Sequence, residues 1–211
     1  MEMGLVNRVL AMLFWKIKII IENMENMENN NFFLKNGYMI LRDFFSTEEI
    51  NNLLKDAKNV FLKQFINKKY IKKTNLEDLP DSVFNNLMYR LFNEDIECLS
   101  NCGKQVQHLI SLHRLSTSHK ITELLTHYGL KTPVISTRPV LFFNHPKLAK
   151  KKVFYKVAAH QDWRSMQGSL NSLVIWIPLM DIDKNLGALE ILPGSHLKGL
   201  RTKEMESGFG M

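Results

Sequence analysis

Val153-Phe154-Tyr155-Lys156-Val157-Ala158-Ala159-His160-Gln161-Asp162-Trp163 is the stretch of this 211-residue chain from which the fold and the chemistry are inferred. Its apolar and β-branched residues predict a strand that delivers a histidine and an aspartate two positions apart. Residues i and i+2 of a strand project to the same face, so His160 and Asp162 can bind one metal ion while Gln161 points away. An imidazole and a carboxylate are two of the three ligands in the 2-His-1-carboxylate triad of non-haem Fe(II) sites. Because chance His-x-Asp triplets are common, the triplet needs support from its context.

The composition indicates one soluble globular domain, with 45% hydrophobic and 23% charged residues. The formal net charge is +7, and the lysines lie in short clusters without a recognition-helix pattern. This pattern disfavours nucleic-acid binding and fits a small-molecule substrate that carries negative charge. The two cysteines, Cys98 and Cys102, imply no disulfide framework, so a cytoplasmic location is expected.

The N-terminal region predicts a helix followed by a linker. Apolar residues recur at helical spacing over residues 5–21, and cations interrupt them too often for a membrane span. Packing of this amphipathic helix against protein is the favoured interpretation, and contact with a membrane interface is the alternative. Residues 24–31 form a polar, low-complexity stretch. The predicted division is therefore an N-terminal helix and linker over residues 1–31 and a folded domain over residues 32–211.

Within the domain, helical patterns precede strand patterns. Ser46 and Glu49 form a capping-box sequence at a helix start. Apolar residues repeat at helical spacing over 50–61, 81–99, 106–112 and 119–127. Short apolar or β-branched runs occupy 134–143, 153–159, 172–179 and 188–192. This order predicts an α+β fold with an antiparallel sheet.

Three segments taken together resemble the phytanoyl-CoA dioxygenase family. They are His160-Gln161-Asp162-Trp163, the run from Ser172 to Asp181 (SLVIWIPLMD), and the run from Asn185 to His196 (NLGALEILPGSH). The opening run from Phe32 to Ser46 is similar to the family's N-terminal strand and first helix, and the resemblance spans roughly residues 32–200. It implies Fe(II)- and 2-oxoglutarate-dependent oxygenase chemistry on a double-stranded β-helix (jelly roll), with N-terminal helices packed on that core.

The resemblance also implies roles for individual residues. It places Fe(II) on His160 and Asp162, which would be the catalytic pair. It places an aromatic residue near the cosubstrate at Trp176, where a plain core role is the alternative. Arg138 is a candidate for holding a carboxylate of the cosubstrate or substrate, with solvent exposure as the alternative.

The segment from Trp163 to Asn171 is expected to lie over the open metal face. There Trp163, Arg164 and Gln167 offer groups suited to substrate recognition. His196 follows the Pro193-Gly194 turn and is interpreted as a loop residue that makes hydrogen bonds, outside the iron shell.

One departure from the family pattern matters. Family members supply a second histidine ligand and then an arginine that anchors 2-oxoglutarate, both after the Pro-Gly-Ser-His turn. Here the only histidine after Asp162 is His196. We therefore expect a chain truncated at its C-terminus, without the last strands. The predicted function is hydroxylation of a small organic metabolite, and the alternative is a non-catalytic binding module that lacks a complete metal triad.

Overall fold

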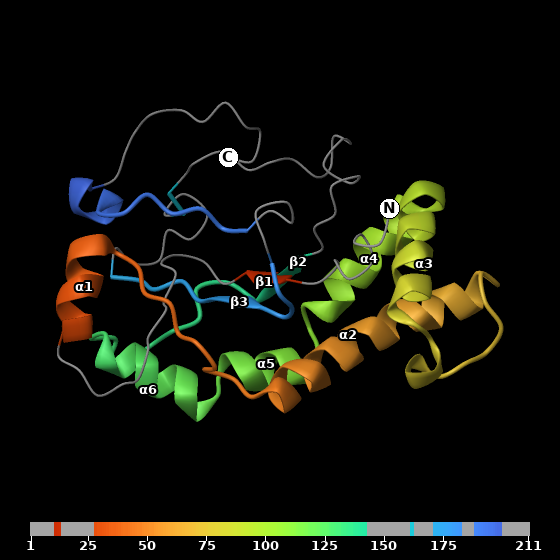
Figure 1. Ribbon diagram of the computed structural model, residues 1–211, viewed down its shortest axis with the longest axis horizontal. Coiled ribbons are helices and arrows are strands. Elements are labelled where there is room, and N and C mark those ends of the chain that lie inside the picture. Colours follow the sequence, from red (N-terminus) through yellow and green to blue (C-terminus); the bar gives the residue numbers. More distant parts are fainter. Residues whose placement is uncertain (1–10, 14–27, 143–160, 163–170, 183–187, 200–211) are drawn as a thin grey trace, which may run out of the picture.

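Figure 1 shows the computed structural model, which describes residues 11–13, 28–142, 161–162, 171–182 and 188–199. Its elements are β1 (Ala11–Leu13), α1 (Glu28–Asn36), α2 (Thr47–Asn67), η1 (Leu76–Asp78), α3 (Asp81–Glu94), α4 (Ile96–Val106), α5 (Ile110–Ser116), α6 (His119–His127), β2 (Val140–Phe142), β3 (Trp176–Pro178) and η4 (Ser195–Lys198). In Figure 1 the short strands lie in the middle of the molecule, with α1 and α6 towards one end and α3 and α4 towards the other. Among the described residues, no helix is both long and apolar enough to cross a membrane.

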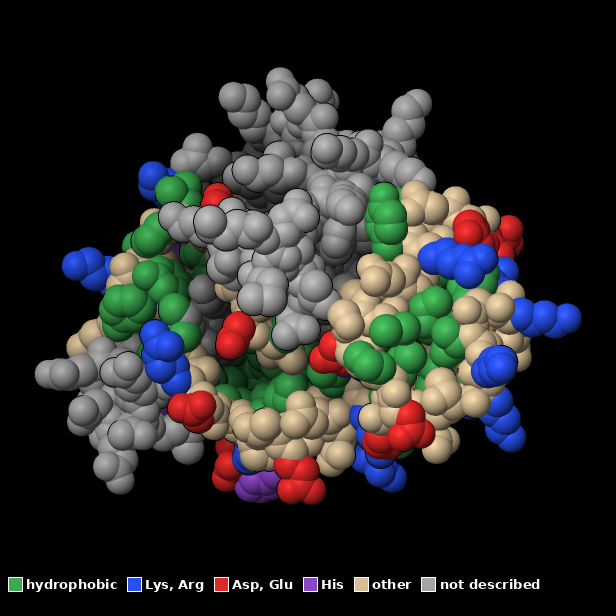
Figure 2. Space-filling model, turned by 45° about the vertical axis from the view of Figure 1, so that its right-hand side comes forward, with side chains coloured by type: hydrophobic (Ala, Val, Ile, Leu, Met, Phe, Trp, Pro, Cys, Tyr) green, Lys and Arg blue, Asp and Glu red, His purple; other side chains and the backbone are tan. Residues whose placement is uncertain are grey.

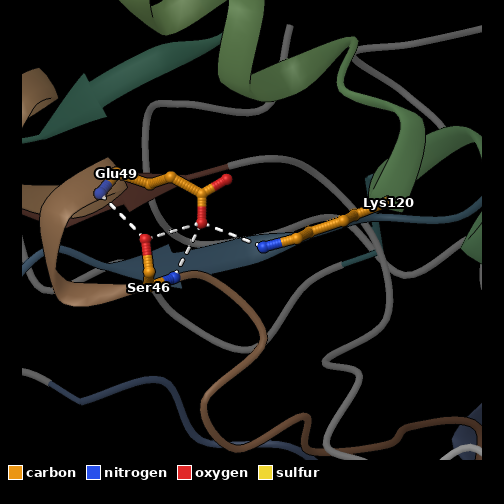
Figure 3. A network of polar contacts seen from close by, with 3 residues as sticks. All are labelled: Ser46, Glu49 and Lys120. Carbon is orange, nitrogen blue, oxygen red and sulfur yellow. Dashed lines mark hydrogen bonds and ion pairs between the residues drawn. The ribbon is translucent and has the colours of Figure 1, made fainter.

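The long helix α2 starts at the predicted capping box. Ser46 is the N-cap; its hydroxyl accepts a hydrogen bond from the Glu49 backbone N–H at 3.2 Å, and its own backbone N–H donates to Glu49 Oε2 at 2.8 Å. Lys120 of α6 donates to the same carboxylate oxygen at 2.9 Å (Figure 3). The box therefore satisfies two free donors at the helix start and also ties α2 to α6.

A helical core forms around the apolar face of α2. The predicted helical residues Leu53, Ala57 and Phe61 are all buried. Farther along, Phe65 stacks edge to face on Phe84 of α3, with 5.4 Å between the ring centroids. Burial of large aromatic side chains dominates the energetics of such cores. This core fixes α2, α3 and α4 as the rigid part of the chain.

A three-stranded antiparallel sheet packs against that core, with strand order β2-β1-β3. Leu141 of β2 and Ile177 of β3 are buried in the same hydrophobic cluster as the helices. The central strand is β1, in which Met12 pairs with Leu141 on one side and Ile177 on the other. The helix predicted over residues 5–21 is therefore wrong for Ala11–Leu13. A short apolar run suits a buried strand as well as a helix, and here pairing on both sides decides for the strand.

Other predicted boundaries differ in detail. The pattern over 81–99 contains two helices, because Asp95 ends α3 and caps α4. The pattern near 106–112 becomes α5, which starts at Ile110, while α6 matches its prediction. The predicted domain start at residue 32 falls inside α1, where a strand was expected.

The strand predictions have mixed outcomes. The runs at 134–143 and 172–179 contain β2 and β3. The run at 188–192 is irregular, and Leu189 and Leu192 are exposed, because no described strand lies beside it to accept its hydrogen bonds. The run at 153–159 lies outside the described residues. The jelly roll stays a prediction.

Candidate metal and substrate site

The structure describes Asp162 and its neighbour Gln161 from the predicted metal-binding stretch. Asp162 lies in a turn and is half-buried, and its Oδ1 atom is buried. Gln161 has no regular secondary structure, so the described end of this stretch is not a strand as predicted. The Gln161 side chain donates from Nε2 to the carbonyl oxygen of Gly199, at 2.9 Å. His160 lies outside the described residues.

The Pro-Gly-Ser-His turn packs against the end of α1. The backbone N–H of Gly194 donates to the Asn36 carbonyl at 2.8 Å, and His196 Nε2 lies 2.8 Å from the Leu34 carbonyl oxygen. Because a carbonyl only accepts, Nε2 of His196 carries the proton. The prediction that His196 makes loop hydrogen bonds is confirmed.

Gly37 gives the His196 ring its space. A Cβ atom at Gly37 would lie 2.2 Å from His196 Nδ1, and the residue has a φ of +75°. Both features require glycine: the first for close approach and the second for the left-handed conformation after a helix. The Leu34 carbonyl therefore engages Nε2 of His196, and the missing Cβ of Gly37 leaves room for the Nδ1 side of the ring.

A small second core fixes α1 from its other side. Phe33 of α1 packs against Tyr128, with 4.5 Å between ring centroids. The Tyr128 hydroxyl donates to Met39 Sδ at 2.7 Å, and burial raises the pKa of Tyr128 to about 12. Met39 and Leu124 of α6 are fully buried in this cluster. The α1 end that receives the turn is therefore attached to α6.

Two further candidates lie at the starts of β2 and β3, at the end of the sheet where Val140 and Trp176 both pair with Leu13. Arg138 precedes β2, is exposed, and donates from Nε to Gln107 Oε1 at 2.6 Å, beside the end of α4. Trp176 begins β3, is half-buried, and pairs in register with Leu13. Their roles toward a cosubstrate stay predictions.

The predicted substrate-loop residues, Trp163, Arg164 and Gln167, lie outside the described residues. Within the described ranges, no group of three or more His, Cys, Asp or Glu side chains gathers at a metal-binding distance. On the face shown in Figure 2, the described lysines and arginines stand apart from one another, with acidic side chains between them. The positive charge of that face is thus spread out.

Sequence reasoning missed the contact between Gln161 and Gly199. Its partners are 38 positions apart, and nothing in the local pattern marks either one as a partner. The contact between Gly37 and His196 was missed for the same reason. The available signal was the Pro193-Gly194 turn before His196, which indicated only a local role.

Comparison with known proteins gives one result. The family model described as Phytanoyl-CoA dioxygenase (PhyH) matches residues 33–209. No curated protein and no solved structure matches the chain. The match spans the Gln161–Asp162 stretch, the Pro-Gly-Ser-His turn and the helical region, so this chain belongs to the phytanoyl-CoA dioxygenase family.

Proposed function

We propose that this protein is an Fe(II)- and 2-oxoglutarate-dependent dioxygenase that hydroxylates a small organic metabolite. The observation that carries the proposal is the family match across His160 and Asp162, together with the buried carboxylate oxygen of Asp162. The net charge of +7 supports a substrate that carries negative charge.

The donor set is chemically suited to Fe(II). His160 offers an imidazole nitrogen and Asp162 a carboxylate, as in the facial triad of non-haem iron enzymes. A carboxylate that is withdrawn from water interacts more strongly with a cation than an exposed one does. We do not assign His196 as a ligand, because its Nε2 is hydrogen-bonded to the Leu34 carbonyl. We assign no third protein ligand.

When bound, iron and 2-oxoglutarate supply the oxidising chemistry for an unactivated C–H bond. The chain's own part is to hold the cation at His160 and Asp162 and to orient the reactants. Arg138 is the candidate for binding a carboxylate of the cosubstrate or substrate, because a guanidinium can hold a carboxylate through two parallel N–H groups; its Nε donates to Gln107 Oε1. The proposed jelly roll would supply the scaffold on which these groups converge.

The test is 2-oxoglutarate decarboxylation by the full chain, with and without Fe(II), alongside calorimetric titration with Mn(II). We expect His160→Ala and Asp162→Ala each to abolish both turnover and metal uptake. Matched controls are His119→Ala, whose side chain is 83% exposed on α6, and Asp181→Ala, which is exposed after β3. Turnover retained in either site variant refutes the assignment.

A non-catalytic binding module on the same scaffold is the second candidate. It is favoured by one observation: Nε2 of His196 in the Pro-Gly-Ser-His turn is hydrogen-bonded to the Leu34 carbonyl of α1. The same titration separates the two candidates. Saturable uptake of 2-oxoglutarate that requires Mn(II) supports the enzyme, whereas its absence in a folded chain supports the module.

A further inference from the structure

The segment from Gly194 to Gly199 is held at both of its ends. At one end, Gly194 N–H donates to Asn36 at the end of α1, and His196 contacts the Leu34 carbonyl. At the other end, the carbonyl of Gly199 accepts the hydrogen bond from Gln161. This segment therefore connects α1 to the residue between the two predicted metal ligands.

The α1 end of this connection is rigidly placed. Phe33, one residue before Leu34, packs on Tyr128, and the Tyr128 hydroxyl contacts the buried Met39. The backbone N–H of Gly37, directly after α1, donates a hydrogen bond to the Phe33 carbonyl at 2.7 Å. Any displacement of the Gly194–Gly199 segment must break hydrogen bonds to α1 or disturb this packing.

We propose that Gln161 is a positioning residue: through Gly199, the α1-anchored segment sets the place of the His160–Asp162 pair. This inference rests on the proposed metal-binding function. Gln161 has no regular secondary structure and Asp162 lies in a turn. The side-chain hydrogen bond of Gln161 links this turn to the Gly194–Gly199 segment, one residue along the chain from each proposed ligand.

Groups that orient metal ligands without touching the metal influence affinity. Loss of such a partner typically weakens metal binding about tenfold to a hundredfold. Gln161 acts on its neighbours only through the backbone, and its hydrogen bond is between neutral groups, so we expect a loss at or below the lower end of this range. The expected loss is about three- to tenfold in metal affinity.

The test is a Co(II) titration of the full chain, followed by visible absorption, which responds to coordination geometry as well as affinity. Gln161→Met keeps the side-chain length and removes the donor. His196→Ala removes one of the two hydrogen bonds that hold the same segment to α1, without changing the metal-binding stretch. The matched control is Gly129→Ala, at the end of α6, where φ is +88° and an added Cβ meets nothing within 4 Å.

We expect Gln161→Met and His196→Ala each to weaken Co(II) binding about three- to tenfold and to alter its spectrum. Gly129→Ala should leave both unchanged, which separates positioning from general destabilisation. Both contacts link the same segment, one to Gln161 and one to α1. The double variant should therefore bind Co(II) about as weakly as the weaker-binding single variant.

The outcomes distinguish the two proposals. If wild type binds Co(II), His160→Ala does not, and Gln161→Met binds like wild type, positioning by Gln161 is wrong and the metal site stands. If the losses of Co(II) affinity in the two single variants add fully in the double variant, the proposal that both contacts act through the same segment is also wrong. If wild type takes up no Co(II), both the metal site and its positioning are refuted.

Discussion

Gly37→Ala tests the contact on which the α1-to-turn connection depends. Gly37 follows the last residue of α1 with a φ of +75°, and its N–H donates to the Phe33 carbonyl at 2.7 Å. An added Cβ would lie 2.2, 2.7 and 2.8 Å from the Nδ1, Cγ and Cε1 atoms of His196. These distances are far below van der Waals contact, so the imidazole ring must move.

The magnitude follows from two costs. An alanine in the left-handed region costs about 1–2 kcal/mol. The His196 ring cannot withdraw without giving up its 2.8 Å contact with the Leu34 carbonyl, and a hydrogen bond of this kind contributes about 0.5–1.5 kcal/mol. We therefore expect Gly37→Ala to lower the free energy of unfolding by about 2–3 kcal/mol.

The assay is urea unfolding at equilibrium, with Gly129→Ala as the control for backbone strain alone. Gly129 has a φ of +88° and no atom within 4 Å of an added Cβ, so this variant should lose only about 1–2 kcal/mol. In a His196→Ala background the clash is gone, and Gly37→Ala should cost only the strain. The double-mutant cycle should then show a coupling of about 1 kcal/mol between Gly37 and His196. Equal losses in the two glycine variants, or strict additivity with His196→Ala, would refute the reasoning.

The remaining predictions concern the helical core. Asp95→Ala removes the side-chain cap on the Cys98 N–H (2.8 Å), so thermal unfolding should show a free energy of unfolding lower by about 1–2 kcal/mol. Asp95→Asn can still cap and should lose less. Equal losses in the two variants would contradict the capping role. The hydrogen bond from the Ser46 backbone N–H, then that from Lys120, lowers the pKa of Glu49. Stability from Glu49 is thus fully present above its ordinary pKa of 4.5 and is lost as pH falls through the lower folded-state value. Glu49→Gln should reduce the change of the free energy of unfolding with pH in that acid range. An unchanged pH dependence would contradict the stabilising role of Glu49 in the capping box. Burial is the largest cause that raises the pKa of the Cys102 thiol to about 12. A thiol reagent at neutral pH should therefore modify Cys102 only after unfolding in urea, and mass spectrometry would detect the modification.

Local signals in the sequence predicted local structure well. Ser46 and Glu49 are three residues apart, and the capping box needs only that spacing, so its prediction could be made without knowledge of the fold. The same holds for α6, whose apolar periodicity is complete within its own residues. The interpretation of His196 as making capping or loop hydrogen bonds came instead from the family resemblance, which places this position in a loop.

Features set by distant partners could not be predicted in this way. Ala11–Leu13 is a strand because it pairs with β2 and β3, which are more than a hundred positions away along the chain. Its apolar residues alone fit a helix or a strand equally. Gln161 was assigned the role of pointing away from the metal, and the sequence held no indication that Gly199 receives its side chain.

The connection through Gly194–Gly199 does not by itself decide between an oxygenase and a binding module, because either would need a fixed turn. Its consequence is different: Gln161, which lies between the two proposed ligands in the sequence, is linked to α1 through contacts that involve neither proposed ligand. A substitution at Gly37 or His196 should therefore change metal affinity if the pair binds a cation, and only stability if it does not. That difference makes α1 a test of the metal site that is independent of any change at His160 or Asp162. An effect of Gly37→Ala on Co(II) affinity that Gly129→Ala lacks would thus support the site from a distance.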